Sequence, residues 1–290
     1  MNRQQFLRLT GAGIVGSALL PENIFATMIS AKSNLSVQLY TIRDVIALDL
    51  EGSVKRIADI GFKYVETAFW PEQISLEKAA AAIKKAGLKV SSCHIELPIG
   101  NKKDDFLKTA KAFDCKRLIW HGWPEDKRYS SIEGTKELIK VYNDAAAFAK
   151  SNGLEFGLHN HWWEYRNKVD GKSVHEWLLK ETDPDIFFEI DTYWVKVAGY
   201  NPAEVIKKFG KRARYLHIKD GPAVWDEKKL LSDEPDPMTA VGKGTQNIPA
   251  IIDAAKDTEF FVVEMDKVKG DVFKSLKESY DYLHKKFKLS

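Results

Sequence analysis

Cysteine is scarce in this sequence: only Cys93 and Cys115 occur among its 290 residues. Disulfide-rich secreted folds and cysteine-based structural zinc sites both require more thiols than this. The first cysteine falls in the middle of one predicted strand and the second lies just before the next strand, which argues against a bridge between them. We therefore predict two buried, reduced thiols.

An excess of charge of one sign is also lacking. The 44 Lys and Arg residues nearly balance the 41 Asp and Glu residues, which leaves a net charge of +3. The chain has no basic arm and no RNA-binding motif, so nucleic acid is not an expected partner. The apolar fraction of 44% and the charged fraction of 29% are ordinary for a globular protein with a sizeable core.

The N-terminal apolar run, GAGIVGSALL at 11–20, is too short to cross a membrane. It follows Arg3 and Arg8 and precedes small-residue sites, and this order is typical of an export signal. Gln4 stands where a twin-arginine signal would carry its second arginine, so the signal is a degenerate one.

We predict that residues 1–32 are this signal and that the mature chain begins between Thr27 and Lys32. The mature protein would then be periplasmic or otherwise exported, without insertion into a membrane. One alternative is an amphipathic helix packed on the fold. If the signal is not functional, the protein is cytoplasmic.

No glycine-rich turn follows the first predicted strand, which argues against an open, doubly wound sheet that binds a dinucleotide. What the sequence does contain is a repeated unit of strand, polar turn and amphipathic helix. The eight predicted strands cover 35–43, 63–69, 89–97, 117–123, 155–161, 186–194, 213–221 and 260–266. This rhythm predicts a single-domain α/β fold, a (β/α)8 TIM barrel over residues 33–290, with the doubly wound sheet as the alternative.

The helical segments between these strands carry their own signals. In 135–153 the residues Leu138, Tyr142 and Ala149 fall on one apolar stripe, and Gly153 is placed to end the helix. Asn201 followed by Pro202 predicts the start of another helix.

Ionisable side chains gather at the carboxyl ends of the predicted strands. Alternate residues of a barrel strand face the interior, and this alternation assigns the following residues inward: His94, Glu96, Gly157, His159, His161, Glu189, Asp191, His217, Lys219 and Glu264. Burying several unpaired ionisable groups together costs several kcal/mol each unless something neutralises them. Such a set therefore predicts a bound cation.

Asp191, His217 and Glu264 are the predicted ligands of one divalent metal ion. Carboxylates and an imidazole suit Mn²⁺, Co²⁺, Mg²⁺ or Zn²⁺. Glu189 lies one layer deeper, where it serves either the site or a salt bridge to Lys219 or Arg214.

Four segments in this order resemble the xylose isomerase-like barrel superfamily, and more narrowly its sugar phosphate isomerases/epimerases, related to inosose dehydratases and ketose 3-epimerases. These segments are HNHWWEY (159–165), EIDTYWV (189–195), YLHIKDG (215–221) and VVEMD (262–266). The resemblance implies one divalent metal held by Glu, Asp, His and Glu from strands five to eight.

Matched to that pattern, the last three ligands are Asp191, His217 and Glu264. Gly157 stands where many relatives carry the first glutamate, so Glu164 is assigned as the fourth ligand and His161 is its competitor.

The resemblance also assigns roles in the reaction to further residues. The predicted proton carriers are His161, His159 and Glu264. Lys219 is predicted to donate to the oxyanion, with pairing to Asp220 or Glu189 as the alternative. The predicted contacts to the substrate are His94, Glu66, Trp194 and Trp163. The tryptophans could equally belong to the core.

Such a site favours removal of a proton next to a carbonyl, with a metal-stabilised enediolate. We expect an isomerase or epimerase acting on a small sugar or keto-sugar. The alternatives are a lyase or hydratase on 3-keto-glycosides or inososes, and a non-catalytic periplasmic sugar-binding barrel. A phosphodiesterase of the same superfamily would need more than the seven histidines present. A homodimer is compatible with the sequence, which does not decide the question.

Overall fold

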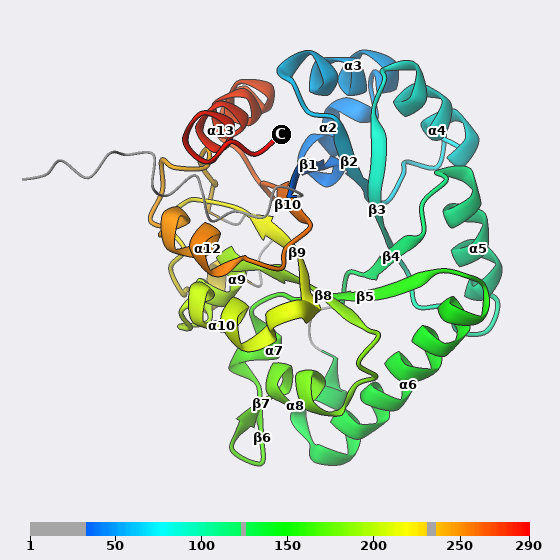
Figure 1. Cartoon of the computed structure of the whole chain (residues 1–290), viewed down its shortest axis with the longest axis vertical. Coiled ribbons are helices and arrows are strands. Elements are labelled where there is room, and N and C mark those ends of the chain that lie inside the picture. The colour runs from blue at the N-terminus through cyan, green and yellow to red at the C-terminus, as the bar shows by residue number, and fades with distance from the viewer. Residues whose placement is uncertain (1–32, 123–125, 231–235) are drawn as a thin grey trace, which may run out of the picture.

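Eight parallel strands close into a barrel surrounded by helices in the computed structural model, which describes residues 33–122, 126–230 and 236–290 (Figure 1). The strands follow one another around the barrel in chain order, and the last pairs with the first. The predicted (β/α)8 barrel is therefore confirmed. The predicted export signal at 1–32 lies outside the described residues.

The barrel strands are short and fall within the predicted segments, except that the first begins one residue earlier, at Asn34. They are β1 (Asn34–Gln38), β2 (Tyr64–Thr67), β3 (Lys89–Ile95), β4 (Arg117–Trp120), β5 (Glu155–His159), β8 (Phe187–Asp191), β9 (Ala213–Ile218) and β10 (Phe260–Val263). A separate hairpin consists of β6 (Lys168–Val169) and β7 (Lys172–Ser173).

Helices occupy the connections. They are α2 (Arg43–Ile46), α3 (Leu50–Ile60), α4 (Leu76–Lys85), α5 (Lys102–Ala112), α6 (Ile132–Ser151), α7 (Trp163–Arg166), α8 (Val174–Glu181), α9 (Thr192–Val197), α10 (Pro202–Phe209), α11 (Glu227–Leu230), α12 (Ile248–Ala254) and α13 (Val272–Phe287). Short 3₁₀ turns cover Leu39–Ile42, Lys127–Ser130 and Gly210–Arg212. None of the helices in this part of the chain is both long and apolar enough to cross a membrane.

Local signals in the sequence account for the helix ends. The predicted stripe of α6 is buried, and Gly153 follows the helix with φ of 70°, a conformation that glycine adopts without strain. Asn201 caps α10 by accepting a hydrogen bond from the Ala203 N–H, and Pro202 occupies the first turn. Both predictions of helix ends are confirmed.

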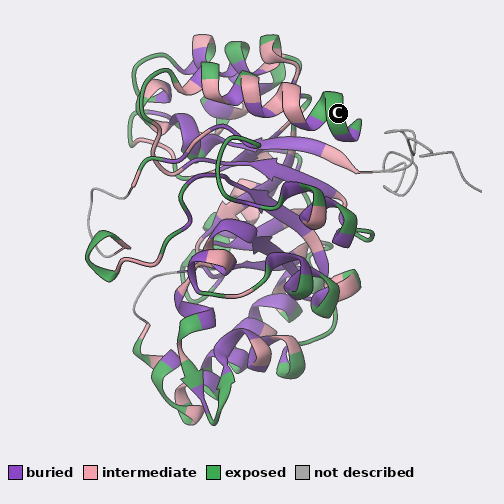
Figure 2. Ribbon diagram, turned by 90° about the vertical axis from the view of Figure 1, so that its left-hand side faces the viewer, coloured by how far each residue is buried: buried purple, intermediate pink, exposed green. Residues whose placement is uncertain are grey.

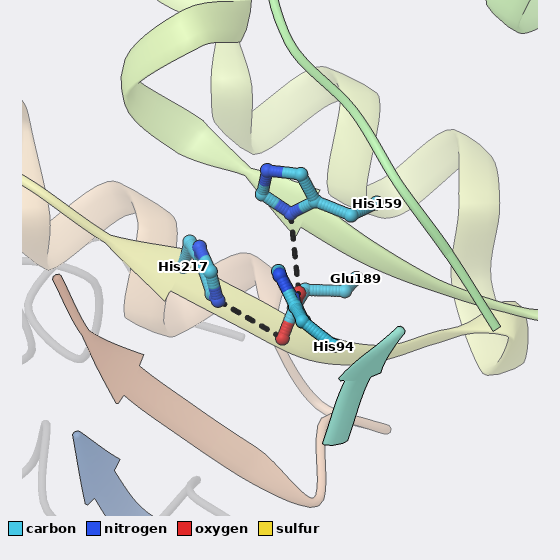
Figure 3. Close-up of side chains that lie close together, drawn as sticks. All are labelled: His94, His159, Glu189 and His217. Carbon is cyan, nitrogen blue, oxygen red and sulfur yellow. Dashed lines mark hydrogen bonds and ion pairs between the residues drawn. The ribbon is translucent and has the colours of Figure 1, made fainter. Parts of the chain in front are cut away.

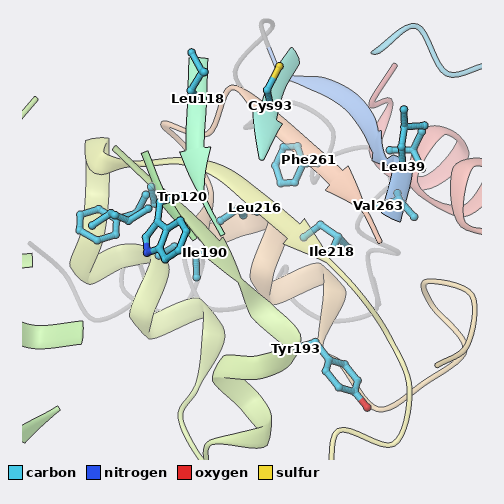
Figure 4. Packing of buried hydrophobic residues seen from close by; sticks show 14 of the residues in the cluster. Leu39, Cys93, Leu118, Trp120, Ile190, Tyr193, Leu216, Ile218, Phe261 and Val263 are labelled. Carbon is cyan, nitrogen blue, oxygen red and sulfur yellow. The ribbon is translucent and has the colours of Figure 1, made fainter. Parts of the chain in front are cut away.

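An apolar layer covers the outside of the barrel wall. Outward-facing side chains such as Leu118, Leu216 and Val263 pack between the strands and the helices (Figure 4). The strands are buried almost throughout, whereas the helices expose one face (Figure 2). Cys93 and Cys115 are both free and buried in this wall, as predicted.

The barrel interior changes character along its axis. Its amino-terminal half is filled by a compact apolar cluster of Ile119, Phe187, Tyr215, Phe260 and Val262. The next inward-facing positions toward the carboxyl ends carry ionisable and polar side chains instead, which are also buried. The apolar layer therefore forms a floor, and the polar groups lie above it at the end of the barrel where enzymes of this fold keep their active sites.

Candidate active site

Three predicted ligands meet at the carboxyl ends of β8, β9 and β10. One ligand atom from each of Asp191, His217 and Glu264 can be chosen so that all three lie within 4.8 Å of one another. His217 is fully buried, as is Asp191, and Glu264 is 5% exposed. The sequence prediction that these three side chains converge is therefore confirmed, while their role as metal ligands stays a prediction.

Asp191 is held by the backbone at the point where β8 ends and α9 begins. Its Oδ1 accepts hydrogen bonds from the N–H groups of Tyr193 and Trp194, which caps the helix. The side chain of Asn160 holds the backbone of Asp191 by accepting from its N–H at 3.0 Å. These contacts use one carboxylate oxygen and leave Oδ2 for the site.

His217 is oriented by carboxylates on both sides of its ring. Its Nε2 lies 2.7 Å from Glu66 and 3.1 Å from Glu189, and its Nδ1 lies 2.6 Å from Oε2 of Glu264. Burial alone would lower the pKa of His217, but Glu189, Glu264 and Glu66 hold it well above its usual value. The same surplus of negative charge that retains a proton on this ring would attract a metal cation in its place.

Two atoms at the centre of this group test whether a metal ion fits. Asp191 Oδ2 and His217 Nδ1 are buried, and neither has a hydrogen-bond partner of acceptable geometry among the described residues. Their close charged neighbours are Lys219 and Glu264, at 3.0 and 2.6 Å. Buried polar atoms that point at one another without a hydrogen bond suit a shared cation, so the residues fit a divalent metal.

His159 offers a further ligand atom from β5. Its Nδ1 lies 3.1 Å from Glu189, and its Nε2 lies 3.9 Å from Oδ2 of Asp191. An imidazole that gives one N–H to a carboxylate and turns its other nitrogen toward a cation is the usual arrangement of a ligating histidine. Burial lowers the pKa of His159 to about 3, so its ring is neutral, as a metal ligand must be.

A second ionic layer lies beneath these groups and orients them. Figure 3 shows the rings of His94, His159 and His217 gathered around the carboxylate of Glu189. Glu189 and Glu66 both contact His94, at 2.6 and 3.2 Å. The structure thus pairs Glu189 with histidines, and not with Lys219 or Arg214, the salt-bridge partners suggested as the alternative.

Glu66 is fully buried in this layer and is not among the residues that line the cavity above the ligands. It accepts hydrogen bonds from Gln38 at 2.8 Å and from Ser92 at 2.5 Å, in addition to its contact with His217. A predicted contact of Glu66 with substrate therefore has no support from its position. It orients His217 instead.

Glu164 lies apart from the converging ligands. Its Oε2 accepts a hydrogen bond from the His161 N–H at 2.9 Å, and it belongs to neither ligand cluster found among the described residues. Burial raises the pKa of Glu164 to about 8. The geometry favours His159 over both Glu164 and His161 as the fourth ligand.

Lys219 and His161 both line the cavity above the ligands. Burial would lower the pKa of Lys219, but Asp191, Asp266 and Glu264 hold it well above its usual value. Burial lowers the pKa of His161 well below its usual value, and its ring stacks on Trp163 at 4.1 Å. The site therefore offers a permanent ammonium donor and a neutral imidazole that can accept a proton.

The cavity has a volume of about 420 Å³. Six predicted residues line it besides His94: His159, His161, Trp163, Trp194, Lys219 and Glu264. A larger groove of about 700 Å³ lies at the amino ends of the strands, beside Tyr64 and Arg117, and holds none of the ligand clusters. Chemistry therefore points to the smaller cavity.

Among the lining residues that the sequence analysis missed, His121 and Asp266 carry an imidazole and a carboxylate. Both lie two positions beyond an inward-facing residue, Ile119 on β4 and Glu264 after β10, so the alternation that assigned the other residues would have found them. Asp266 contacts Lys219 at 2.9 Å.

Comparisons with known proteins agree with this geometry. The model of the xylose isomerase-like TIM barrel family matches residues 54–286. A sugar phosphate isomerase/epimerase from Parabacteroides distasonis superposes with a TM-score of 0.69 at 23% identity, over 89% of this chain and 97% of that one. A D-allulose 3-epimerase from Methylomonas sp. gives 0.64 at 15%, over 89% and 99%.

A probable 3-DHS dehydratase involved in petrobactin synthesis from Bacillus anthracis gives a TM-score of 0.64 at 14% identity, over 86% of this chain and 98% of that one. At these identities the likeness is one of fold. No curated protein matches the sequence.

Proposed function

Because the chain belongs to the xylose isomerase-like TIM barrel family, we propose that it is a divalent-metal-dependent enzyme of the sugar isomerase/epimerase type. Its reaction would begin with removal of a proton from a carbon next to the carbonyl of a small sugar or keto-sugar. The observation that carries this proposal is the convergence of Asp191, His217 and Glu264 beside a cavity that holds proton carriers.

Asp191, His217 and Glu264 would hold the metal ion, with His159 as fourth ligand. When bound, such an ion polarises a carbonyl and stabilises the negative charge that develops on its oxygen. Mn²⁺, Co²⁺, Mg²⁺ and Zn²⁺ are all compatible with this set of oxygen and nitrogen donors.

Proton transfer falls to side chains from different strands. His161 follows β5 and is neutral because burial lowers its pKa, so it can accept the proton. Glu264 follows β10; burial opposes its charge, but Lys219 and His217 hold its pKa well below the usual value and keep it ionised. Return of the proton to the other face of the same carbon gives epimerisation, and return to the neighbouring carbon gives isomerisation.

The second candidate function is a lyase or hydratase that acts on 3-keto-glycosides or inososes. The observation that favours it is the ammonium group of Lys219, which lines the cavity and can stabilise a departing oxygen by donating a hydrogen bond to it. After the same proton removal, loss of a β-substituent would complete an elimination.

Deuterium exchange tests the shared first step. We expect the purified protein with Mn²⁺ to incorporate deuterium from D₂O at a carbon next to the carbonyl of at least one keto-sugar, as followed by NMR. His161→Gln should lower that rate by about 10²-fold or more while binding Mn²⁺ normally, because it removes the base and leaves Asp191, His217, Glu264 and His159, the ligands that the geometry favours, unchanged. Absence of exchange with every keto-sugar would contradict the proposal, and analysis of the products separates epimerisation, isomerisation and elimination.

The Glu264→Gln variant separates an enzyme from a sugar-binding barrel. An enzyme loses turnover, because both the base and a metal ligand are changed. A binding protein keeps most of its affinity for the sugar, which calorimetry measures directly.

A further inference from the structure

A second cavity adjoins the first at the carboxyl ends of β2 and β3. It has a volume of about 250 Å³ and shares Ala68, Phe69 and His94 with the larger cavity. Both cavities therefore open from one region, and a ligand seated on the metal-binding side can continue past Phe69 into the second space.

The second cavity has the chemistry of a sugar subsite. Thr67, Glu96, Asp105 and Thr109 supply hydroxyl and carboxylate groups to its wall, and Trp70 supplies an aromatic face. Carboxylates accept hydrogen bonds from sugar hydroxyls, while aromatic rings bury the apolar C–H face of a pyranose. A few polar groups beside an aromatic surface are typical of a site for a small polar ligand.

The charges of both cavities disfavour a phosphate group. Lys219 supplies the basic side chain in the first cavity, as far as the described residues show. Its ammonium already contacts the carboxylates of Asp191, Glu264 and Asp266 at 2.7–3.0 Å. In the second cavity the basic side chain is that of Lys102, whose ammonium lies 3.6 Å from the carboxylate of Asp105. A phosphate on a sugar whose carbonyl lies at the metal ion would fall in the second cavity, where it would meet the carboxylates of Glu96 and Asp105 and the ammonium of Lys102, and this net negative charge repels it.

Phe69 stands at the boundary between the two spaces. It is 49% exposed, although its ring makes an edge-to-face contact with His121 at 4.7 Å. A large aromatic ring left half exposed where two cavities meet can pack against apolar faces of a ligand that passes over it.

We propose that the substrate is a neutral two-ring sugar, a glycoside whose reacting ring lies in the first cavity and whose second sugar ring lies in the second. This inference rests on the proposed function and deepens it by naming the substrate class. It predicts that a free monosaccharide and a sugar phosphate are both poor substrates.

The test compares three probes with the Mn²⁺-loaded protein: a 3-keto-disaccharide, the matching 3-keto-hexose and a ketohexose 6-phosphate. We expect kcat/KM for deuterium exchange to be at least about tenfold higher for the disaccharide than for the hexose. The phosphate should be the poorest probe. Phe69→Ala and Asp105→Asn should each lower the disaccharide-to-hexose ratio about fivefold to tenfold. Ile99→Ala is the matched control, because Ile99 is 52% exposed in the loop between β3 and α5 and lines neither cavity.

Calorimetry with an unoxidised disaccharide and its monosaccharide gives a second readout that needs no turnover. The two-ring inference would be overturned if the disaccharide and the monosaccharide bound with equal affinity and Phe69→Ala left the ratio of their affinities unchanged. Faster deuterium exchange with the ketohexose phosphate than with the disaccharide would also overturn it. If no probe exchanges deuterium, the proposed function fails. The calorimetric preference for the disaccharide then decides the two-ring inference by itself.

Discussion

At the scale of single residues, Gly157 illustrates how packing decides which side chains reach the site. A Cβ at this position would lie 2.5 Å from the ring of Phe187, which belongs to the apolar floor of the barrel. The space in which many relatives are expected to hold a glutamate is thus filled by a phenylalanine from the neighbouring strand. His159, the next inward residue of β5, supplies the ionisable group instead.

We predict that Gly157→Ala lowers the free energy of unfolding by about 1–3 kcal/mol, because a methyl group is forced against a packed ring. Phe187→Leu should relieve that clash, so the double variant should be less destabilised than the sum of the single variants by at least about 0.5 kcal/mol. Urea unfolding of the four proteins measures both quantities. If the two changes in unfolding free energy simply added in the double variant, the contact with Phe187 would not be what excludes a side chain at position 157.

At the scale of elements, the end of β5 is fastened to the end of β8 by Asn160. Its side chain accepts from the Asp191 N–H at 3.0 Å and donates to the Asp191 carbonyl at 3.4 Å, and the residue is 1% exposed. This bridge sets the height at which the Asp191 carboxylate enters the site.

Removing the bridge should therefore affect both stability and metal binding. We expect Asn160→Ala to lower the free energy of unfolding by about 1–3 kcal/mol, because it leaves buried backbone groups unpaired. Affinity for Mn²⁺ should fall about tenfold, as is usual when a group that orients a ligand is lost. Asn152→Ala is the control, since Asn152 is exposed and its amide bonds only to α6. Unchanged Mn²⁺ affinity in Asn160→Ala would show that Asp191 is held by other contacts.

The same elements show what the sequence could and could not predict. The inward positions of Glu189, Asp191 and His217 followed from alternation, because both faces of a barrel strand are buried. Strand ends were predicted too late, since aromatic and β-branched residues continue past Asp191 while its side chain already starts a helix. Glu164 was assigned as fourth ligand from the family resemblance and not from alternation, and this assignment stays a prediction. The chain turns into α7 beyond His161, where alternation no longer gives the direction of a side chain, and Glu164 belongs to neither ligand cluster among the described residues.

At the scale of the whole molecule, buried neutral histidines make stability depend on pH. His175 is 2% exposed, stacks on Tyr165 at 4.3 Å and belongs to neither ligand cluster found among the described residues. Burial lowers its pKa to about 3, compared with about 6.5 in an unfolded chain. Below pH 6.5 the unfolded state binds a proton that the folded state does not. Stability is therefore complete above pH 6.5 and falls as the pH drops toward 3.

We expect this group to cost about 1.4 kcal/mol of unfolding free energy per pH unit below pH 6.5, or about 2 kcal/mol at pH 5. His175→Phe and His175→Gln both remove the titration but differ in packing, so each serves as a control for the other. The loss of stability between pH 7 and pH 5, measured by urea unfolding, should be about 2 kcal/mol smaller in both variants than in the wild type. An equal loss in all three proteins would assign the acid sensitivity to other groups.

The pairing of β1 with β10 brings the two extremes of the fold side by side. During synthesis, β1 gains β2 early but cannot gain its other neighbour until β10 has been translated. Until that moment one edge of the nascent sheet stays open, and its unpaired backbone groups are available to other chains. Aggregation of this protein should therefore be decided late in translation, when β10 either completes the ring or fails to reach it.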